Sequence, residues 1–307
     1  MKIIPLAADS LGVRSMATYV EAGATGLLID PGATLAPARY GLPPSSEEWE
    51  ALKRANDRIS AYASRCRYVF VSHYHDDHFR SDPVSYAGRV VLAKDPRRMV
   101  SGAQARRAHA LWTALADQAR IQPADGAALT TPDLDLKVSP PLPHGTEGTT
   151  LGYVVALTVV DYREHERFVF ASDVQGPLSS VAAAWLIQQR PTTLYLSGPP
   201  SYVEREVGTA AIDRAVDNLR RILDATGCRV IMDHYAMRDP RFSTRFERLW
   251  ATGRVVTAAA HLGVDAQPLE ARRDRLWAAV RKPPAKAAPS RFVSREARRA
   301  ARGGASQ

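Results

Sequence analysis

Short apolar runs, separated by glycine, proline and charged residues, recur along the chain and predict alternating strands and helices. Strands are expected where about four to eight apolar or alternating residues occur, and helices where apolar residues recur at spacings of three and four. The predicted strands are 2–7, 15–21, 27–30, 68–72, 89–93, 135–138, 151–160, 167–172, 193–197 and 229–232. The predicted helices are 46–65, 96–120, 178–189 and 209–225.

Charge changes this picture at the C-terminal end. The chain has 307 residues, of which 45% are hydrophobic and 24% charged, so it has enough apolar surface for a sizeable core. The formal net charge is +9, and residues 271–307 hold 11 basic and 2 acidic residues, while the rest holds 30 of each. We therefore predict one domain over 1–282 and a basic, disordered tail over 283–307. Because the body is neutral, any contact with nucleic acid is expected through the tail only.

Several classes of protein are excluded by what the chain lacks. Cys66 and Cys228 are the two cysteines, too few for a disulfide framework or a cysteine-ligated zinc cluster, and we expect them to be small buried side chains. There is no apolar run of about 18 residues and no secretory signal pattern. No membrane association and a cytoplasmic localisation are therefore expected, and the oligomeric state is left open.

Histidine and aspartate side chains follow the ends of several predicted strands. The segment His73–His78, with the sequence HYHDDH, comes directly after the strand 68–72. Asp30, His144, Asp173 and His234 lie at or just past other strands. Strand ends are where layered α/β folds build their sites, and imidazole with carboxylate suits zinc or another divalent metal.

These residues can be arranged as two sets of metal ligands joined by a bridging residue. The sets are His73, His75 and His144 for one ion, and Asp77, His78 and His234 for the other, with Asp173 as the bridge. Two divalent ions are therefore expected, zinc first, with manganese or iron as alternatives. Such a site leaves a position open for water and generates hydroxide near neutral pH.

The motif His-x-His-x-Asp-His, with the later His144, Asp173 and His234, resembles the metallo-β-lactamase superfamily. The resemblance implies an αββα sandwich, a layered α/β fold, and implies that Asp30 supports the metal-binding loop by hydrogen bonds. The stretches IIPLAADSLGVRSMATYVE and LLIDPG are similar to a smaller subgroup of stand-alone proteins of this fold, for which no substrate is implied. Only 60 residues separate Asp173 from His234, too few for the inserted domain of the β-CASP nucleases.

The expected function is that of a metal-dependent hydrolase whose metal-bound hydroxide attacks an ester, lactone or phosphodiester of a small-molecule or nucleotide-like substrate. Asp77 and Asp173 are the expected catalytic carboxylates. Tyr235 and Tyr40 either contact the substrate or simply pack. Two alternatives stay open: a nuclease or phosphodiesterase assisted by the tail, and a non-catalytic, metal-stabilised scaffold that binds an acidic partner.

Overall fold

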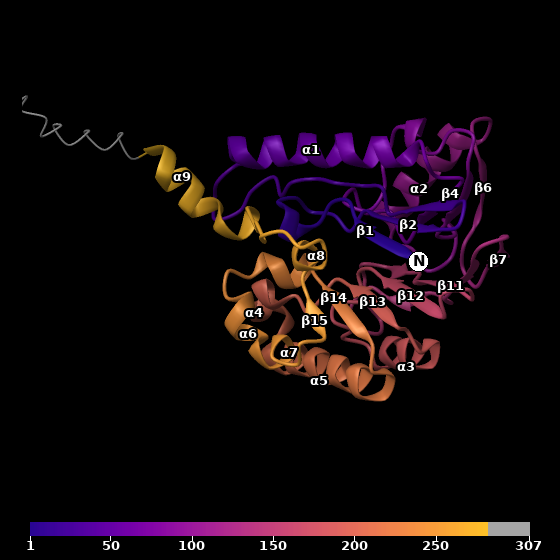
Figure 1. The fold of residues 1–307 in the computed structure, drawn as a ribbon. Helices are drawn as coiled ribbons and strands as arrows, with labels where there is room; N and C mark the ends of the chain where they lie inside the picture. The colour runs from indigo at the N-terminus through magenta and orange to yellow at the C-terminus, as the bar shows by residue number, and fades with distance from the viewer. Residues whose placement is uncertain (282–307) are drawn as a thin grey trace, which may run out of the picture.

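The computed structural model describes residues 1–281, so the predicted tail over 283–307 lies outside the described residues. Two β-sheets lie face to face, and helices cover the outer face of each sheet, which makes four layers (Figure 1). Over residues 1–281, no helix combines the length and the apolar character needed to cross a membrane.

The first sheet has the order β1-β2-β3-β4-β5-β6. Its strands are β1 (Lys2–Pro5), β2 (Thr18–Ala22), β3 (Thr25–Ile29), β4 (Tyr68–Val71), β5 (Val90–Ala93) and β6 (Arg120–Pro123). The first three strands pair antiparallel, whereas β3 to β6 pair in parallel, with Ile29 opposite Phe70. The carboxyl ends of β3 and β4 therefore lie side by side, and the segments that carry Asp30 and His73 leave the sheet at the same edge.

The second sheet has the order β15-β14-β13-β12-β11-β8-β7. Its strands are β7 (Ala128–Thr130), β8 (Asp135–Val138), β11 (Leu157–Asp161), β12 (Glu166–Ala171), β13 (Thr193–Leu196), β14 (Arg229–Met232) and β15 (Val255–Val256). Strands β12 to β15 pair in parallel, so Asp173 and His234 follow carboxyl ends at one edge. A separate pair, β9 (Leu142–Pro143) and β10 (Tyr153–Val154), leads into His144.

Helices and short turns connect the strands. The helices are α1 (Ser46–Ala63), α2 (Gly102–Leu115), α3 (Ser180–Gln189), α4 (Glu204–Val207), α5 (Thr209–Thr226), α6 (Phe242–Arg245), α7 (Glu247–Trp250), α8 (Ala258–His261) and α9 (Arg273–Arg281). Helix α1 begins at a capping box, in which Ser45 accepts from the Glu48 amide and Glu48 accepts from the Ser45 amide. Helix α5 ends at Gly227, which adopts the left-handed conformation.

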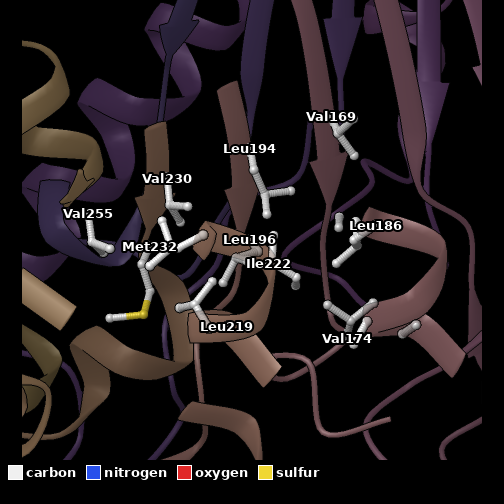
Figure 2. Packing of buried hydrophobic residues seen from close by; sticks show 14 of the residues in the cluster. Val169, Val174, Leu186, Leu194, Leu196, Leu219, Ile222, Val230, Met232 and Val255 are labelled. Atoms are coloured by element: carbon white, nitrogen blue, oxygen red, sulfur yellow. The ribbon is translucent and has the colours of Figure 1, made fainter. Parts of the chain in front are cut away.

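Side chains alternate between the layers along the central strands. On β4, Tyr68 and Phe70 pack between the two sheets, while Val69 and Val71 pack under the helices of the first sheet. Figure 2 shows the corresponding outer layer of the second sheet, where β12, β13 and β14 pack against α3 and α5. The labelled residues there are Val169, Val174, Leu186, Leu194, Leu196, Leu219, Ile222, Val230, Met232 and Val255. Each such buried side chain stabilises the fold by about 1.5–3 kcal/mol.

Two of the differences between the structure and the predicted elements lie near the site. The helix predicted over 96–120 is shorter, because Ser101 caps α2 and Arg120 already belongs to strand β6. The strand predicted over 151–160 is divided into β10 and β11, because the Val155 amide donates to the carbonyl of Ser72 at 3.1 Å and leaves the ladder. The second difference matters for the site, because this hydrogen bond joins the chain after β10 to the segment that carries the histidines.

Candidate metal centre

All seven predicted ligands converge between the two sheets, at the edge where β3, β4, β12 and β14 end. Their donor atoms form two groups, and within each group the atoms lie within 4.8 Å of one another. The first group is His73, His75, His144 and Asp173, and the second group is Asp77, His78 and His234. His75 and Asp77 are partly exposed, and the other five side chains are buried.

In the first group, three imidazoles surround one carboxylate oxygen. Asp173 Oδ2 lies 2.9 Å from His144 Nε2, 3.2 Å from His73 Nε2 and 3.8 Å from His75 Nδ1. His73 and His75 lie on one side of an extended segment, because a single residue separates them. The intervening Tyr74 points away from the site, and its hydroxyl donates to the Lys94 carbonyl and accepts from Trp112 Nε1.

In the second group, the other oxygen of the same carboxylate faces two imidazoles. Asp173 Oδ1 lies 3.3 Å from His78 Nε2 and 3.5 Å from His234 Nε2. The Asp77 carboxylate completes this group, with Oδ2 3.6 Å from His234 Nε2 and Oδ1 3.9 Å from His78 Nε2. Asp173 therefore presents one oxygen to each group, as a bridging residue requires.

Buried polar atoms without partners show that this donor set fits a metal. Within residues 1–281, His78 Nε2 and Asp173 Oδ1 are both buried and neither has a hydrogen-bond partner. Leaving such atoms unpaired in a protein interior is unfavourable, by about 1–3 kcal/mol for each group. Imidazole nitrogens and carboxylate oxygens in sets of three or four are the ligands that zinc takes in proteins.

Hydrogen bonds hold the outward ring nitrogens of His73 and His78. His73 Nδ1 pairs with Ser72 Oγ at 2.9 Å, and His78 Nδ1 pairs with Asp30 Oδ2 at 2.9 Å. Asp30 also accepts from the Ser72 amide at 2.7 Å and from the Ser72 hydroxyl at 2.6 Å. Such partners fix the orientation of ligating imidazoles. Asp30 thus lies where it supports the loop, which is the position that the resemblance implied.

Two turns at this edge have special backbone geometry. Asp30 and His234 both have positive φ angles, 44° and 55°, which residues other than glycine rarely adopt. Gly32 lies so close to the histidine segment that an added Cβ would be 2.6 Å from the His78 amide nitrogen. The turn after β3 is therefore pressed directly against the backbone of His78.

The electrostatics of the cluster favour positive charge. Burial alone would lower the pKa of His78, but the carboxylates of Asp173 and Asp77 raise it well above its usual range. Burial alone would raise the pKa of the Asp173 carboxyl, but His78 and His73 hold it well below its usual range. The carboxylates that hold a proton on His78 also attract a metal cation to the same position.

Both groups border a cavity of about 670 Å³, which His75 and His144 of the first group and Asp77 of the second group help to line. Tyr235 lines this cavity, and its hydroxyl donates to Asp173 Oδ2 at 2.7 Å. Burial and the nearby Asp173 carboxylate raise the pKa of Tyr235 well above its usual range, so the hydroxyl stays protonated. Tyr40 is not brought into this set, because its hydroxyl donates to the Ala271 carbonyl at 3.1 Å and its ring lies outside the cavity lining.

Three further residues of the site were missed by sequence reasoning. Asp9 Oδ2 pairs with His234 Nδ1 at 2.7 Å, and Arg238 Nε donates to Asp9 Oδ1 at 2.9 Å. Tyr202 stacks on Tyr235 with an angle of 9° between the rings. Asp9 had a usable signal, since it lies just past the first strand, as the other site residues lie past theirs.

Known proteins resemble this chain in sequence and in fold. No protein-family model matches the chain. A UPF0282 protein of Thermococcus gammatolerans is 40% identical over 290 residues, which cover 90% of this chain and 95% of that protein. A UPF0282 protein of Methanopyrus kandleri, MK0213, is 38% identical over 293 residues, which cover 90% of this chain and 99% of that protein.

Among solved structures, unliganded yeast PDE1 superposes with a TM-score of 0.50 at 13% identity, over 83% of this chain and 97% of that one. Tm1679, a metal-dependent hydrolase of the β-lactamase superfamily, superposes with a TM-score of 0.48 at 12% identity, over 83% of this chain and 96% of that chain. The predicted αββα sandwich, with two sheets between outer helices, is confirmed, and yeast PDE1 shares this fold. With 40% identity to the protein of Thermococcus gammatolerans over nearly the whole length of that relative, this chain belongs to the UPF0282 family.

Proposed function

We propose that this protein is a metal-dependent hydrolase with a dinuclear site, acting on a small-molecule substrate. The observation that carries the proposal is the position of Asp173, whose two oxygens face two separate groups of histidines. Purely structural zinc sites are closed and use a single ion, whereas these groups border an open cavity. That contrast favours a catalytic role over a metal-stabilised scaffold.

The residues of the two groups would hold the metal ions, with zinc as the expected metal and manganese or iron as alternatives. Divalent ions held there would supply Lewis acidity and lower the pKa of a coordinated water molecule. The first group would use His73, His75 and His144, the second would use Asp77, His78 and His234, and Asp173 would be shared. The chain's own residues then bind and orient the substrate and move protons.

Two side chains are placed for these tasks. Asp77 lines the cavity, and its Oδ1 can accept a hydrogen bond from a water molecule and orient it toward the scissile bond. Tyr235 keeps its proton and, by exchanging Asp173 Oδ2 for the substrate as its acceptor, can donate a hydrogen bond to the oxygen on which negative charge develops. We therefore keep Asp77 and Asp173 as the proposed catalytic carboxylates and Tyr235 as a proposed substrate contact.

The cavity supports a small-molecule substrate rather than a long polymer. Its volume of about 670 Å³ lies within the range of about 300–1,000 Å³ that is typical of small-molecule sites. The walls combine apolar side chains with arginines. The apolar lining residues are Leu35, Pro37, Leu151, Val203 and Val207. An ester, a lactone or a small phosphodiester with an apolar group fits this lining.

The test combines metal analysis with a substrate panel. We expect two divalent ions per chain by elemental analysis after reconstitution, and at most one would contradict the dinuclear site. A panel of aryl esters, lactones and aryl phosphodiesters should show turnover that a chelator abolishes and Zn²⁺ or Mn²⁺ restores.

The variant Asp173→Ala tests the bridge, and the matched control is His109→Ala on the exposed face of α2. Losing a group that supports a metal commonly reduces activity 10–100-fold, so losing the bridge should reduce it at least about 100-fold. The His109→Ala variant should keep its rate. Full activity of Asp173→Ala would mean that the reaction takes place elsewhere.

A further inference from the structure

A buried arginine lies against the second group of ligands. Arg238 is only 3% exposed, and its Nη2 lies 3.2 Å from Asp77 Oδ2 and 3.1 Å from His234 Nε2. These two atoms are donor atoms of the second group. A guanidinium stays protonated at every ordinary pH, so a full positive charge is built into the wall of this group.

The guanidinium is held in this position from two further sides. Its Nε donates to Asp9 Oδ1 at 2.9 Å, while Asp9 Oδ2 pairs with His234 Nδ1 at 2.7 Å. The rings of Tyr235 and Tyr202 lie 4.8 and 5.8 Å from the guanidinium carbon. The side chain therefore cannot move away without losing an ion pair and its aromatic contacts.

In the part of the chain that the structure describes, the first group has no comparable cation. Among residues 1–281, no lysine or arginine forms a hydrogen bond or an ion pair with its four side chains. Arg107 lines the same cavity, but it pairs with the exposed Asp76 at 3.1 Å. The two groups share Asp173 and lie side by side, yet among the described residues an arginine contacts the second group only.

We infer that Arg238 is an internal counter-charge of the second group, and that it makes this group bind a divalent ion more weakly than the first group does. The inference rests on the proposed dinuclear function. Like charges at close range repel, and Asp9 offsets only part of the charge because it also pairs with His234. Without an ion, the same arginine neutralises Asp77, so the second group is held in shape even when it is empty of metal.

The test is a titration of the metal-free full-length protein with Zn²⁺ in the presence of a competing chelator. Calorimetry measures the dissociation constant of each binding step. In the wild type, we expect two binding steps whose dissociation constants differ by at least about tenfold. In Arg238→Met, which keeps the length and removes the charge, the weaker step should tighten at least about tenfold, while the tighter step changes less than about threefold. Arg238→Lys retains the charge and should stay close to the wild type.

Two further variants keep the result interpretable. Arg107→Met removes another arginine that lines the cavity and should alter neither dissociation constant. If Arg238→Met does not fold because Asp9 is left without its partner, the double variant Asp9→Asn/Arg238→Met removes both charges and should still show the tighter second step. A gain in affinity cannot come from misfolding, so it separates a charge effect from a structural one.

The outcomes also separate this inference from the proposed function. Two equal binding steps in the wild type, or a second step that does not tighten in the folded charge-removing variants, would overturn the role of Arg238 and leave the dinuclear site intact. Binding of a single ion by the wild type and by every variant would instead overturn the dinuclear site itself.

Discussion

Replacing Gly32 with alanine would test how the turn after β3 positions His78. An added Cβ would lie 2.4 Å from the Phe79 amide nitrogen and 2.6 Å from the His78 amide nitrogen, whereas ordinary contact begins at 3.4 Å. Both obstacles are backbone atoms, so a change of rotamer cannot relieve the overlap. One of the two segments would have to move by about 1 Å.

A movement of this size is large for the site. His78 Nδ1 is 2.9 Å from Asp30 Oδ2, and a displacement of about 1 Å would take this pair beyond hydrogen-bond distance. Overpacking commonly destabilises a protein by about 1–3 kcal/mol, which lowers the melting temperature by at least about 2 °C for a chain of this size. We expect Gly32→Ala to melt at least 2 °C lower and to retain about one ion fewer per chain.

Differential scanning fluorimetry and elemental analysis measure both effects, and Gly102→Ala is the matched control. Gly102 begins α2, and an added Cβ there would meet nothing closer than Arg106 Nη1 at 3.9 Å. Because alanine favours helix over glycine, the control should melt at the wild-type temperature or slightly above it. If Gly32→Ala matched the wild type in both measurements, the close approach of this turn to His78 would not be what positions the ligand.

Three other predictions follow from burial and composition. Burial raises the pKa of Cys66 to about 12, so at pH 8 only about one thiol in 10,000 is ionised, and iodoacetamide should label neither Cys66 nor Cys228 until urea is added; labelling of native Cys66 at pH 8 would contradict its burial. Deleting residues 283–307 should change the melting temperature by less than about 5 °C, as measured by calorimetry, because Phe292 and Val293 are the large apolar residues of this stretch. If the tail binds RNA, the binding should weaken steeply with salt and disappear on the same deletion, and RNA binding retained by the shortened chain would place the contact on the body.

The sequence predicted the parts of the site that depend on local pattern. A strand that runs directly into HYHDDH places its histidines at a sheet edge whatever the rest of the chain does, and the structure brings Asp173 and His234 to the same edge. The burial of Cys66 and Cys228 is confirmed for the same reason, because each cysteine lies beside an apolar strand.

The contact of Asp9 with His234 and the strand β6 could not be predicted, because both depend on contacts between residues that are distant in the sequence. Asp9 and His234 are separated by 225 positions, and no local pattern shows that the first loop of the chain reaches the last ligand. Strand β6 was missed for a related reason. Its residues Arg120–Pro123 are polar or only partly buried, and only the pairing with β5 makes them a strand. In both cases the tertiary context determines the outcome, and local propensity does not.

The division of the ligands along the chain has a consequence for how the protein is made. All four residues of the first group have been synthesised once Asp173 has been added, whereas the second group has to wait for His234, 61 residues later. At about 5–20 residues per second, the ribosome needs about 3–12 s to cover that interval. On the proposed two-ion site, the nascent chain carries the donors for one ion before it can carry those for two, and the order of translation would favour filling the first group first.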